Sequence, residues 1–293
     1  MPRIIQSLSE VSAGYDTLYC DLWGCLHNGH APYAAAVAAL QAFRATKGRV
    51  VLMTNAPRPN RYVEAQLGRM GVPHDAWDMI VSSGDAAQVA LFSGAVGRKV
   101  YHLGPDKDDG FFTDIPSDLV DAPAIRRVPL EEAEGIVCTG PFDEHNDTPD
   151  DYRPTFLHAK AKGLKLLCTN PDLIVDYGET RIYCAGALAA LYEEMGGESL
   201  YFGKPYPPIY DLARRRLVAA GFESDPARIL AVGDGIGTDI RGGLGEGIDT
   251  IFVTGGLAAD AFGPDVEAPE SGPLGVWLEE HQITPTYCMG RLR

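Results

Sequence analysis

Short runs of apolar residues alternate along the chain with longer segments whose apolar positions recur every three or four residues. The runs at 17–20, 50–55 and 228–232 are continuous, which is typical of strands buried on both faces of a parallel sheet. Between the first two, residues 34–45 are rich in alanine and apolar at helical spacing, which predicts a helix. Strand, helix and strand in this order form the unit of a right-handed parallel sheet. The pattern therefore predicts an α/β protein.

The alternation continues through the rest of the chain. Further strands are predicted at 99–103, 135–139, 164–169, 199–202 and 250–253, and further helices at 61–70, 152–162, 186–195, 208–220 and 274–281. Residues 1–16 are predicted to form a short helical lead-in. The tail after residue 281 is predicted to contribute no further element.

The length of the chain suits two modest domains, because 293 residues with 45% hydrophobic content exceed what one small core needs. We predict a doubly wound parallel-sheet core formed by residues 1–83 and 188–293. The segment between Thr54 and Lys204 is far longer than one crossover requires, so most of it should form a second domain. Residues 84–187 are therefore predicted to form an inserted α/β cap domain.

The charge balance excludes two classes of partner. The chain has 40 acidic residues against 25 Lys and Arg, a formal net charge of −15. This field repels nucleic acid and anionic membranes, so we expect neither as a partner. No apolar stretch approaches the length of a membrane span, and the first residues lack the apolar core of a signal peptide. We expect a cytoplasmic protein and leave a homodimer open.

The six cysteines, Cys20, Cys25, Cys138, Cys168, Cys184 and Cys288, are scattered through apolar segments without a C-x-x-C pair. This usage predicts buried, reduced thiols. Cys25 follows the first strand, but no base accompanies it in the sequence, so we expect it to pack rather than to act as a nucleophile.

Polar residues that could take part in catalysis follow four of the predicted strands. In chain order they are Asp21, Thr54 with Asn55, Lys204, and Asp234 with Asp239. Because the carboxyl ends of parallel strands meet at one edge of a sheet, we expect these side chains to be neighbours. A nucleophilic carboxylate, a hydroxyl, a cation and further carboxylates are the set that magnesium-dependent phosphoryl transfer requires.

The physical logic of such a site is the management of charge. A carboxylate that attacks a phosphate dianion is repelled by it, and Mg²⁺ shared by Asp21, Asp234 and a phosphate oxygen would offset that repulsion. Thr54 can hold another phosphate oxygen, and Lys204 can neutralise the pair that Asp21 forms with the phosphate. An aspartyl-phosphate would then divide the reaction into two steps.

The ordered motifs resemble those of the haloacid dehalogenase (HAD) superfamily. They are Asp21-Leu-Trp-Gly, Met53-Thr-Asn, Gly203-Lys-Pro and Gly233-Asp-Gly-Ile-Gly-Thr-Asp239-Ile, and with Cys168-Thr-Asn-Pro-Asp172 they look like class IIA, the phosphatases with a large α/β cap. The resemblance covers nearly the whole chain. It implies an HAD-like Rossmannoid core and a phosphatase that acts on a small phosphorylated metabolite.

Carried over residue by residue, the resemblance implies a role for each motif. Asp21 would be the nucleophile and a Mg²⁺ ligand, with the backbone carbonyl of Trp23 and the carboxylate of Asp234 as further ligands. Asp239 would support this metal shell. Thr54, Asn55 and Lys204 would hold the phosphate, and Lys204 would also stabilise the intermediate. Asp172 is expected to fix its own loop.

One position departs from the pattern of the family. Its phosphatases usually carry a second Asp two residues after the nucleophile, which protonates the leaving oxygen, and this chain has Trp23 there. An indole cannot act as an acid or base, although a backbone carbonyl can still bind the metal. His27 is a candidate replacement acid, and the competing interpretation is a histidine of the turn that is exposed or bonded to the backbone.

Loss of general acid catalysis removes about two to four orders of magnitude in rate. Four outcomes stay open at this stage: a slow phosphatase, a phosphatase limited to good leaving groups, an enzyme that cleaves another bond, and a binding protein. The alternative to the phosphatase is thus a non-catalytic or regulatory protein that binds a phosphorylated metabolite on the same scaffold.

Overall fold

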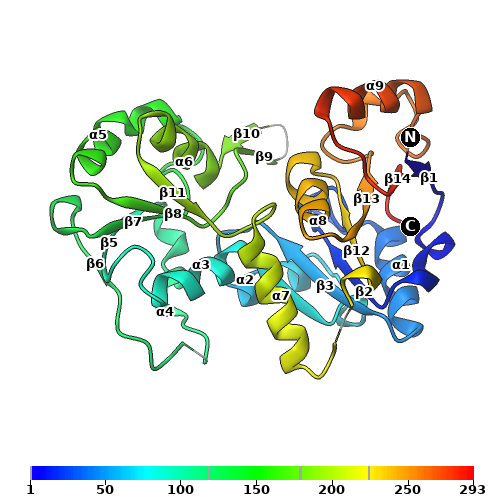
Figure 1. Ribbon diagram of the computed structural model, residues 1–293, viewed down its shortest axis with the longest axis horizontal. Helices are drawn as coiled ribbons and strands as arrows, with labels where there is room; N and C mark the ends of the chain where they lie inside the picture. The colour runs from blue at the N-terminus through cyan, green and yellow to red at the C-terminus, as the bar shows by residue number, and fades with distance from the viewer. Residues whose placement is uncertain (1, 118, 178–179, 224) are drawn as a thin grey trace. The chain divides into compact units, whose positions relative to one another are not determined.

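The computed structural model describes residues 2–117, 119–177, 180–223 and 225–293 (Figure 1). Its internal contacts divide the chain into two compact units. The first unit comprises Met1–Thr54, Glu64–Val81 and Tyr210–Arg293, and the second comprises Asn55–Val63 and Ser82–Ile209. Across the described residues, every helix falls short of the length and apolar character that crossing a bilayer demands.

A seven-stranded sheet forms the centre of the first unit, in the order β1-β14-β13-β12-β2-β3-β4. The strands are β1 (Arg3–Ile4), β2 (Thr17–Cys20), β3 (Arg49–Thr54), β4 (Met79–Ser82), β12 (Ile229–Gly233), β13 (Asp249–Val253) and β14 (Tyr287–Met289). The pairs from β1 through β14, β13, β12 and β2 to β3 are all parallel. All residues of β2 and β12 are buried, as their continuous apolar runs predict.

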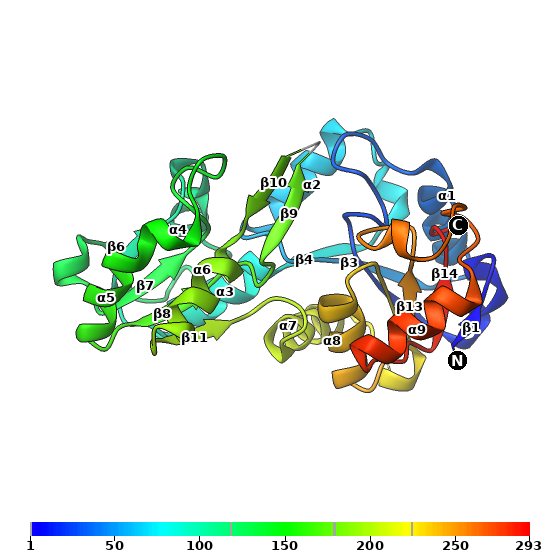
Figure 2. The ribbon, with the colours of Figure 1, turned by 90° about the horizontal axis from the view of Figure 1, so that it is seen from above.

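Helices lie on both sides of this sheet. They are α1 (Ala34–Ala45), α2 (Asn60–Arg69), α7 (Pro207–Ala219), α8 (Arg241–Gly245) and α9 (Ser271–His281), and α2 and α7 begin in the second unit. Figure 2 shows α1 on one side of the sheet and α8 and α9 on the other. The α1 helix buries Ala36, Leu40 and Phe43, which share one helical face. The doubly wound arrangement is confirmed for this unit.

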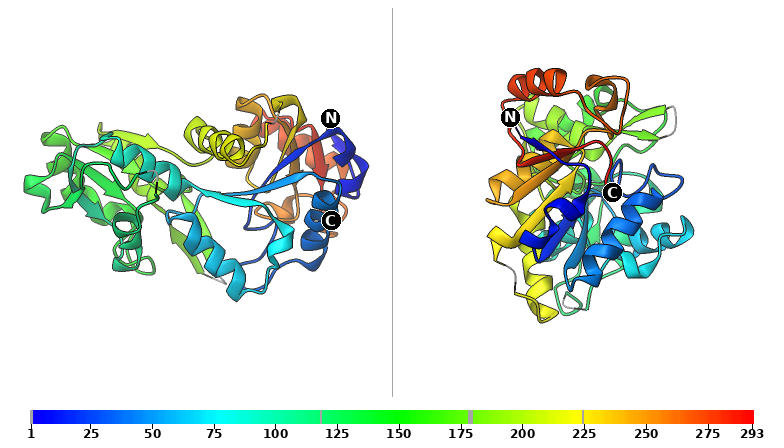
Figure 3. Two further views of the ribbon diagram at one scale, coloured as in Figure 1. Left: turned by 90° about the horizontal axis from the view of Figure 1, so that it is seen from below. Right: turned by 90° about the vertical axis from the view of Figure 1, so that its right-hand side faces the viewer.

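The two ends of the chain depart from the sequence prediction. Residues 2–16 contain β1 and two short 3₁₀ turns, Leu8–Glu10 and Ser12–Gly14, in place of a helical lead-in. The tail also contains a strand, because β14 pairs with both β13 and β1. Figure 3 shows these two terminal strands side by side. Strands of two and three residues are too short to show a periodicity of their own.

The second unit contains a smaller sheet of five parallel strands in the order β11-β8-β7-β5-β6. They are β5 (Lys99–Leu103), β6 (Arg126–Arg127), β7 (Gly135–Cys138), β8 (Lys165–Cys168) and β11 (Glu198–Tyr201). The helices of this unit are α3 (Ser83–Phe92), α4 (Gly110–Thr113), α5 (Arg153–Ala161) and α6 (Ala185–Glu194), and β9 (Ile174–Tyr177) and β10 (Thr180–Tyr183) form an antiparallel pair. The predicted α/β class is confirmed.

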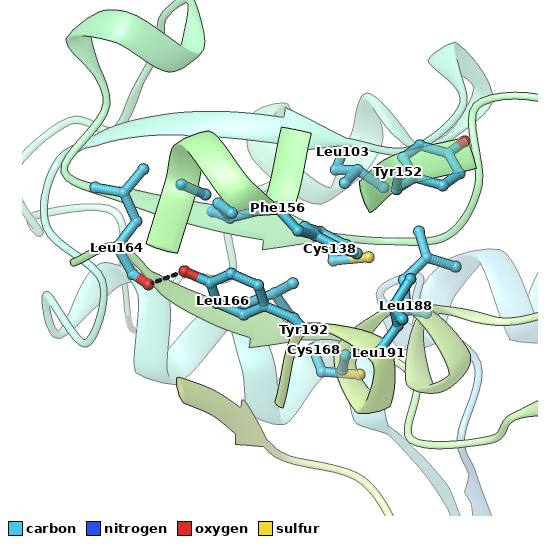
Figure 4. Close-up of a cluster of buried hydrophobic side chains, with 14 of the residues drawn as sticks. Leu103, Cys138, Tyr152, Phe156, Leu164, Leu166, Cys168, Leu188, Leu191 and Tyr192 are labelled. Atoms are coloured by element: carbon cyan, nitrogen blue, oxygen red, sulfur yellow. Dashed lines mark hydrogen bonds between the residues drawn. The ribbon is translucent and has the colours of Figure 1, made fainter. Parts of the chain in front are cut away.

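Alternate strand residues of this sheet face two separate cores. Ile136 and Leu166 pack with Phe156 and Tyr192 of α5 and α6, and the hydroxyl of Tyr192 donates to the Leu164 carbonyl at 2.6 Å (Figure 4). Their neighbours Val137 and Leu167 pack on the opposite face, where α3 lies. Because successive strand residues point to opposite faces, both faces of the sheet are apolar and both are covered.

The predicted boundary after residue 187 is wrong for one strand. Residues 199–202 were predicted as a strand of the core, but β11 pairs with β8 in the second sheet. The second unit accordingly extends to Ile209. A buried parallel strand shows the same apolar run in either sheet, so its pattern does not reveal its partner. That the second unit acts as a cap stays a prediction.

The cysteine prediction is confirmed, because all six cysteines are buried and free.

Candidate functional site: two carboxylates at adjacent strand ends

Three adjacent strands of the first unit end in the polar residues that the sequence singled out. Strand β2 lies between β12 and β3, and Cys20 pairs with Val232 on one side and with Leu52 on the other. Asp21 follows β2 directly, and its backbone N–H donates to the Val232 carbonyl at 2.8 Å. The register therefore brings Asp21, Thr54 and Asp234 to the same edge of the sheet.

The carboxylates of Asp21 and Asp234 converge. One oxygen of each carboxylate and the Cys25 Sγ all lie within 4.8 Å of one another. Asp234 is 5% exposed, and Asp21 is partly buried. Like charges at this distance and burial repel each other, so the arrangement calls for a cation or a shared proton.

Two glycines allow the chain to pass close to Asp234. A Cβ on Gly24 would lie 1.9 Å from the Asp234 Oδ2, and a Cβ on Gly256 would lie 2.0 Å from it. Gly24 also has a φ of +70°, which residues other than glycine rarely adopt. The same Oδ2 accepts a hydrogen bond from the backbone N–H of Leu257 at 2.9 Å. The orientation of the Asp234 carboxylate is thus set by backbone on two sides.

The chemistry of these donors fits a hard divalent cation. Mg²⁺ prefers carboxylate and carbonyl oxygens, and Asp21 and Asp234 each supply one here. Burial, with the nearby carboxylates, raises the pKa of the Cys25 thiol well above its usual range. A neutral thiol is a poor metal ligand. The two carboxylate oxygens, rather than the sulfur, therefore determine which metal ion the cluster prefers.

Asp239 lies behind this pair. Its Oδ2 accepts a hydrogen bond from the Gly235 N–H at 3.1 Å, and the hydroxyl of Thr238 lies 3.4 Å from the same oxygen. A Cβ on Gly233 would lie 2.1 Å from the Cβ of Asp239. Asp239 is 5% exposed and belongs to a single π turn, Ile236–Ile240, a conformation that is frequent at functional sites. It orders the loop that carries Asp234.

Trp23 and His27 form a compact pair in the loop after Asp21. Their rings meet edge to face with centroids 5.4 Å apart, and the Gly24 N–H donates to the His27 carbonyl at 3.0 Å. His27 is 1% exposed, and its Nδ1 accepts a hydrogen bond from the Gly29 N–H at 3.0 Å. Burial lowers the pKa of His27 to about 4, so the ring is neutral at pH 7. This geometry favours the interpretation of a histidine bonded to the backbone over that of a replacement acid.

The remaining predicted residues form a hydrogen-bonded group within the second unit. The amide of Asn55 donates to the Lys204 carbonyl at 3.0 Å, and its oxygen accepts from the Lys204 N–H at 2.7 Å. The same amide nitrogen donates to the Asp172 carboxylate at 2.8 Å. Lys204 is 3% exposed and Asn55 is 5% exposed. Asn55 therefore clamps the backbone at Lys204, and Asp172 holds the clamp.

Some contributors to these two groups could not be found from the sequence. The N–H of Leu257 and the close passage of Gly256 come from a loop more than 20 residues after Asp234, with no motif that marks them. Two other glycines had a signal. Gly24 interrupts the apolar run after Asp21, and Gly203 opens the Gly203-Lys-Pro motif, although the motif does not reveal that a Cβ there would lie 2.5 Å from the Asn55 oxygen.

Comparisons with known proteins agree with this geometry. A family model described as haloacid dehalogenase-like hydrolase matches residues 18–115, and a HAD-hydrolase-like model matches residues 201–272. The glycerol-3-phosphate phosphatase of Gallus gallus is 30% identical over 285 residues, which is 86% of this chain and 84% of that protein.

Solved structures give the same result. A haloacid dehalogenase-like hydrolase from Brucella suis 1330 has a TM-score of 0.84 and 34% identity, over 99% of this chain and all of the other. A possible sugar phosphatase of the HAD superfamily from Cytophaga hutchinsonii has a TM-score of 0.77 at 19% identity over the full length of both, which supports the fold. The chain therefore belongs to the haloacid dehalogenase-like hydrolases.

Proposed function

We propose that this hydrolase is a Mg²⁺-dependent phosphatase that removes phosphate from a small phosphorylated metabolite through an aspartyl-phosphate at Asp21. The observation that carries the proposal is the convergence of the Asp21 and Asp234 carboxylates within 4.8 Å at adjacent strand ends. Two carboxylates this close suit a cation that also binds a phosphate oxygen.

Asp21 is the proposed nucleophile. One of its carboxylate oxygens attacks phosphorus while the bond from phosphorus to the ester oxygen breaks, and water later hydrolyses the acyl phosphate. Asp21, Asp234 and the backbone carbonyl of Trp23 would hold the Mg²⁺, with Asp239 ordering the loop around Asp234. The bound ion would supply positive charge that offsets the repulsion between the nucleophile and the phosphate.

Thr54, Asn55 and Lys204 are proposed to serve the phosphate. Leu52 pairs with Cys20 in the sheet, and Thr54 lies two residues after Leu52 at the end of β3. Asn55 follows Thr54 in the chain. The clamp between Asn55 and the backbone of Lys204 supports a shared role for these residues, because it ties the lysine to the segment that follows Thr54. A lysine ammonium would neutralise negative charge that develops on the transferring group.

The names of several relatives support a phosphate ester of a small molecule as the substrate. They include the glycerol-3-phosphate phosphatase of Gallus gallus and, over only 34% of this chain, a dihydroxyacetone phosphatase of Corynebacterium glutamicum. A glycerol phosphate phosphatase from Mycobacterium tuberculosis, 22% identical, was solved in complex with calcium, which supports a divalent ion. The net charge of −15 argues against nucleic acid as the substrate.

Phosphate release from a panel of esters tests the proposal. Nitrophenyl phosphate and several sugar phosphates would be incubated with wild type in Mg²⁺ and in EDTA. We expect phosphate release from at least one ester of the panel in Mg²⁺ and from none in EDTA. For that ester, turnover should fall at least about a thousandfold in Asp21→Asn, because the nucleophile is removed. Glu280→Gln on the exposed face of α9 is the matched control and should keep wild-type turnover. Full activity of Asp21→Asn with the same esters would refute the proposed mechanism.

Trp23 is proposed to replace the usual general acid without taking over its chemistry. Binding of a phosphorylated metabolite without any turnover would instead support the non-catalytic alternative. The phosphatase names of the curated relatives favour the enzyme.

A further inference from the structure

The loop between β2 and α1, residues 21–33, is poor in acids. After Asp21 it contains neither Asp nor Glu. Its other ionisable side chains are Cys25, His27, His30 and Tyr33. Any proton that this loop delivers to a leaving group must therefore come from one of these four.

Two of the four are withdrawn from solvent. Cys25 and His27 are each 1% exposed, and the Nδ1 lone pair of His27 is used by the Gly29 N–H at 3.0 Å. Neither side chain can exchange protons readily with a substrate that enters from solvent. Their packing explains their presence without a role in proton transfer.

The other two lie at the far end of the loop. His30 is exposed on a turn in which its own N–H and that of Ala31 donate to the Asn28 side chain, at 3.0 and 2.9 Å. The ring of Tyr33 lies under the guanidinium of Arg291, with 4.8 Å from the Arg291 Cζ to the ring centroid. Conservative variants of both residues can test whether either supplies a proton.

The residue two positions after Asp21 offers a planar surface. The six-membered ring of Trp23 lies against the α-carbon of Gly29, where an added Cβ would come within 2.3 Å of the indole Cη2. The edge-to-face contact with His27 fixes the ring from another direction. Trp23 is partly exposed, so part of its surface is open to a ligand. An indole can contact a planar leaving group, but it has no proton to give at neutral pH.

The chemical consequence concerns the leaving oxygen. When Asp21 attacks, the bond from phosphorus to the ester oxygen breaks and its electron pair stays on that oxygen. Without a proton donor the group departs as an anion and takes its proton from water afterwards. A phenolate or enolate delocalises that charge, whereas an alkoxide does not. The absence of a general acid therefore lowers the rate of cleavage far more for alkyl esters than for aryl or enol esters.

We propose, resting on the phosphatase function above, that Trp23 makes this enzyme selective for phosphate monoesters of planar, acidic hydroxyl groups, namely aryl and enol phosphates. Trp23 is the specificity-determining residue of this selection. Esters of aliphatic alcohols, such as glycerol phosphate, are poor substrates.

A series of leaving groups tests the selection. The value of kcat/KM would be measured for substituted phenyl phosphates that span a range of phenol pKa, and for glycerol phosphate. For wild type we expect log(kcat/KM) to fall steeply as the pKa of the leaving group rises. Trp23→Asp should flatten the slope and raise turnover of glycerol phosphate by about 10² to 10⁴. Trp23→Phe keeps an aromatic ring without an acid and should keep the steep slope, as should His30→Gln and Tyr33→Phe.

The wild-type slope decides the inference by itself, so a variant that fails to fold leaves the test intact. Turnover of glycerol phosphate within tenfold of nitrophenyl phosphate would overturn it. A slope that steepens in His30→Gln or Tyr33→Phe would also overturn it, because that residue would then be the acid. No release from any ester would instead contradict the phosphatase function itself, so the two failures are distinguishable.

Discussion

The two units share one architecture but differ in the side chains at the ends of their strands. Each has a parallel sheet with helices on both faces, and in each the strand ends carry polar residues. In the second unit the Thr169 hydroxyl, which follows β8, donates to the Cys138 carbonyl of the neighbouring strand at 3.0 Å. In the first unit Asp21 and Asp234 face each other within 4.8 Å. The chemistry thus depends on which side chains end the strands, not on the fold.

The carboxylate pair is costly for the first unit. Two unit charges at that separation repel by on the order of 3 kcal/mol at a partly solvated site. The buried hydroxyl of Thr169 carries no comparable cost, because its hydrogen bond is satisfied. The ends of β2 and β12 therefore carry an electrostatic cost that the hydroxyl of Thr169 at the end of β8 does not.

The largest expected effect comes from the glycine beside Asp234. Gly256→Ala would place a Cβ 2.0 Å from the Asp234 Oδ2 and displace the carboxylate. We expect Mg²⁺-dependent turnover to fall by about a hundredfold or more, because misplacement of a ligand by about 1 Å has this effect. Gly237→Ala is the matched control, since a Cβ there meets no atom within 4 Å. Equal activities of the two variants in a phosphate-release assay would contradict the proposed metal site.

The Asn55 clamp is next in size. Asn55→Ala removes three hydrogen bonds and leaves the N–H of Lys204 without this acceptor. We expect the free energy of unfolding to fall by about 3 kcal/mol, measured by urea denaturation. Asn146→Ala, which loses one exposed hydrogen bond to Asp143, should change it by less than about 0.5 kcal/mol. Equal losses in the two variants would show that the clamp is not a distinct stabilising feature.

Acid should affect both units alike. Burial lowers the pKa of His27 in the first unit and of His102 in the second to about 4. An unfolded histidine binds its proton near pH 6.5, so between pH 6.5 and 4 the unfolded chain binds more protons than the folded chain. The free energy of unfolding should therefore decrease as the pH is lowered from 6.5 to 4, by about 2–3 kcal/mol for each ring. His102→Gln should lose less stability than wild type between about pH 7 and pH 4.5, and an unchanged pH profile would contradict this assignment.

The smallest effects should have opposite signs. In EDTA, Asp234→Asn should raise the free energy of unfolding by about 1–2 kcal/mol, because it removes one charge of the repelling pair. Thr169→Ala should lower it by about 1 kcal/mol, because it removes a satisfied hydrogen bond. Added Mg²⁺ should stabilise wild type and leave Asp234→Asn unchanged. Thermal denaturation with and without Mg²⁺ measures the effects of both substitutions and of the metal. If both substitutions destabilise the protein in EDTA, the strand ends of the two units do not differ as proposed.

Much of the fold could be predicted because the longer elements have a clear period. Strands β2 and β5 and helix α1 have the predicted bounds, since short apolar runs and an Ala-rich helix leave one interpretation. Strands β1 and β14 were missed because their pairing is long-range and their patterns are short.

The site was predictable in its charged residues and not in its supporting backbone. Asp21 and Asp234 end strands whose adjacency follows from a parallel sheet, so the sequence was enough to bring them together. The contacts of Asp234 with Gly256 and the Leu257 N–H depend on the path of a loop, which no local pattern encodes. The pairing of Trp23 with His27 is of the same kind.

The most direct test of the central claim is to trap the phosphoenzyme. Wild type would be mixed with nitrophenyl phosphate and Mg²⁺, quenched in acid within milliseconds, digested and analysed by mass spectrometry. We expect one phosphoryl group on the peptide that contains Asp21, and none in EDTA or in Asp21→Asn. A phosphoryl group on another residue, or rapid turnover without any phosphopeptide, would contradict it.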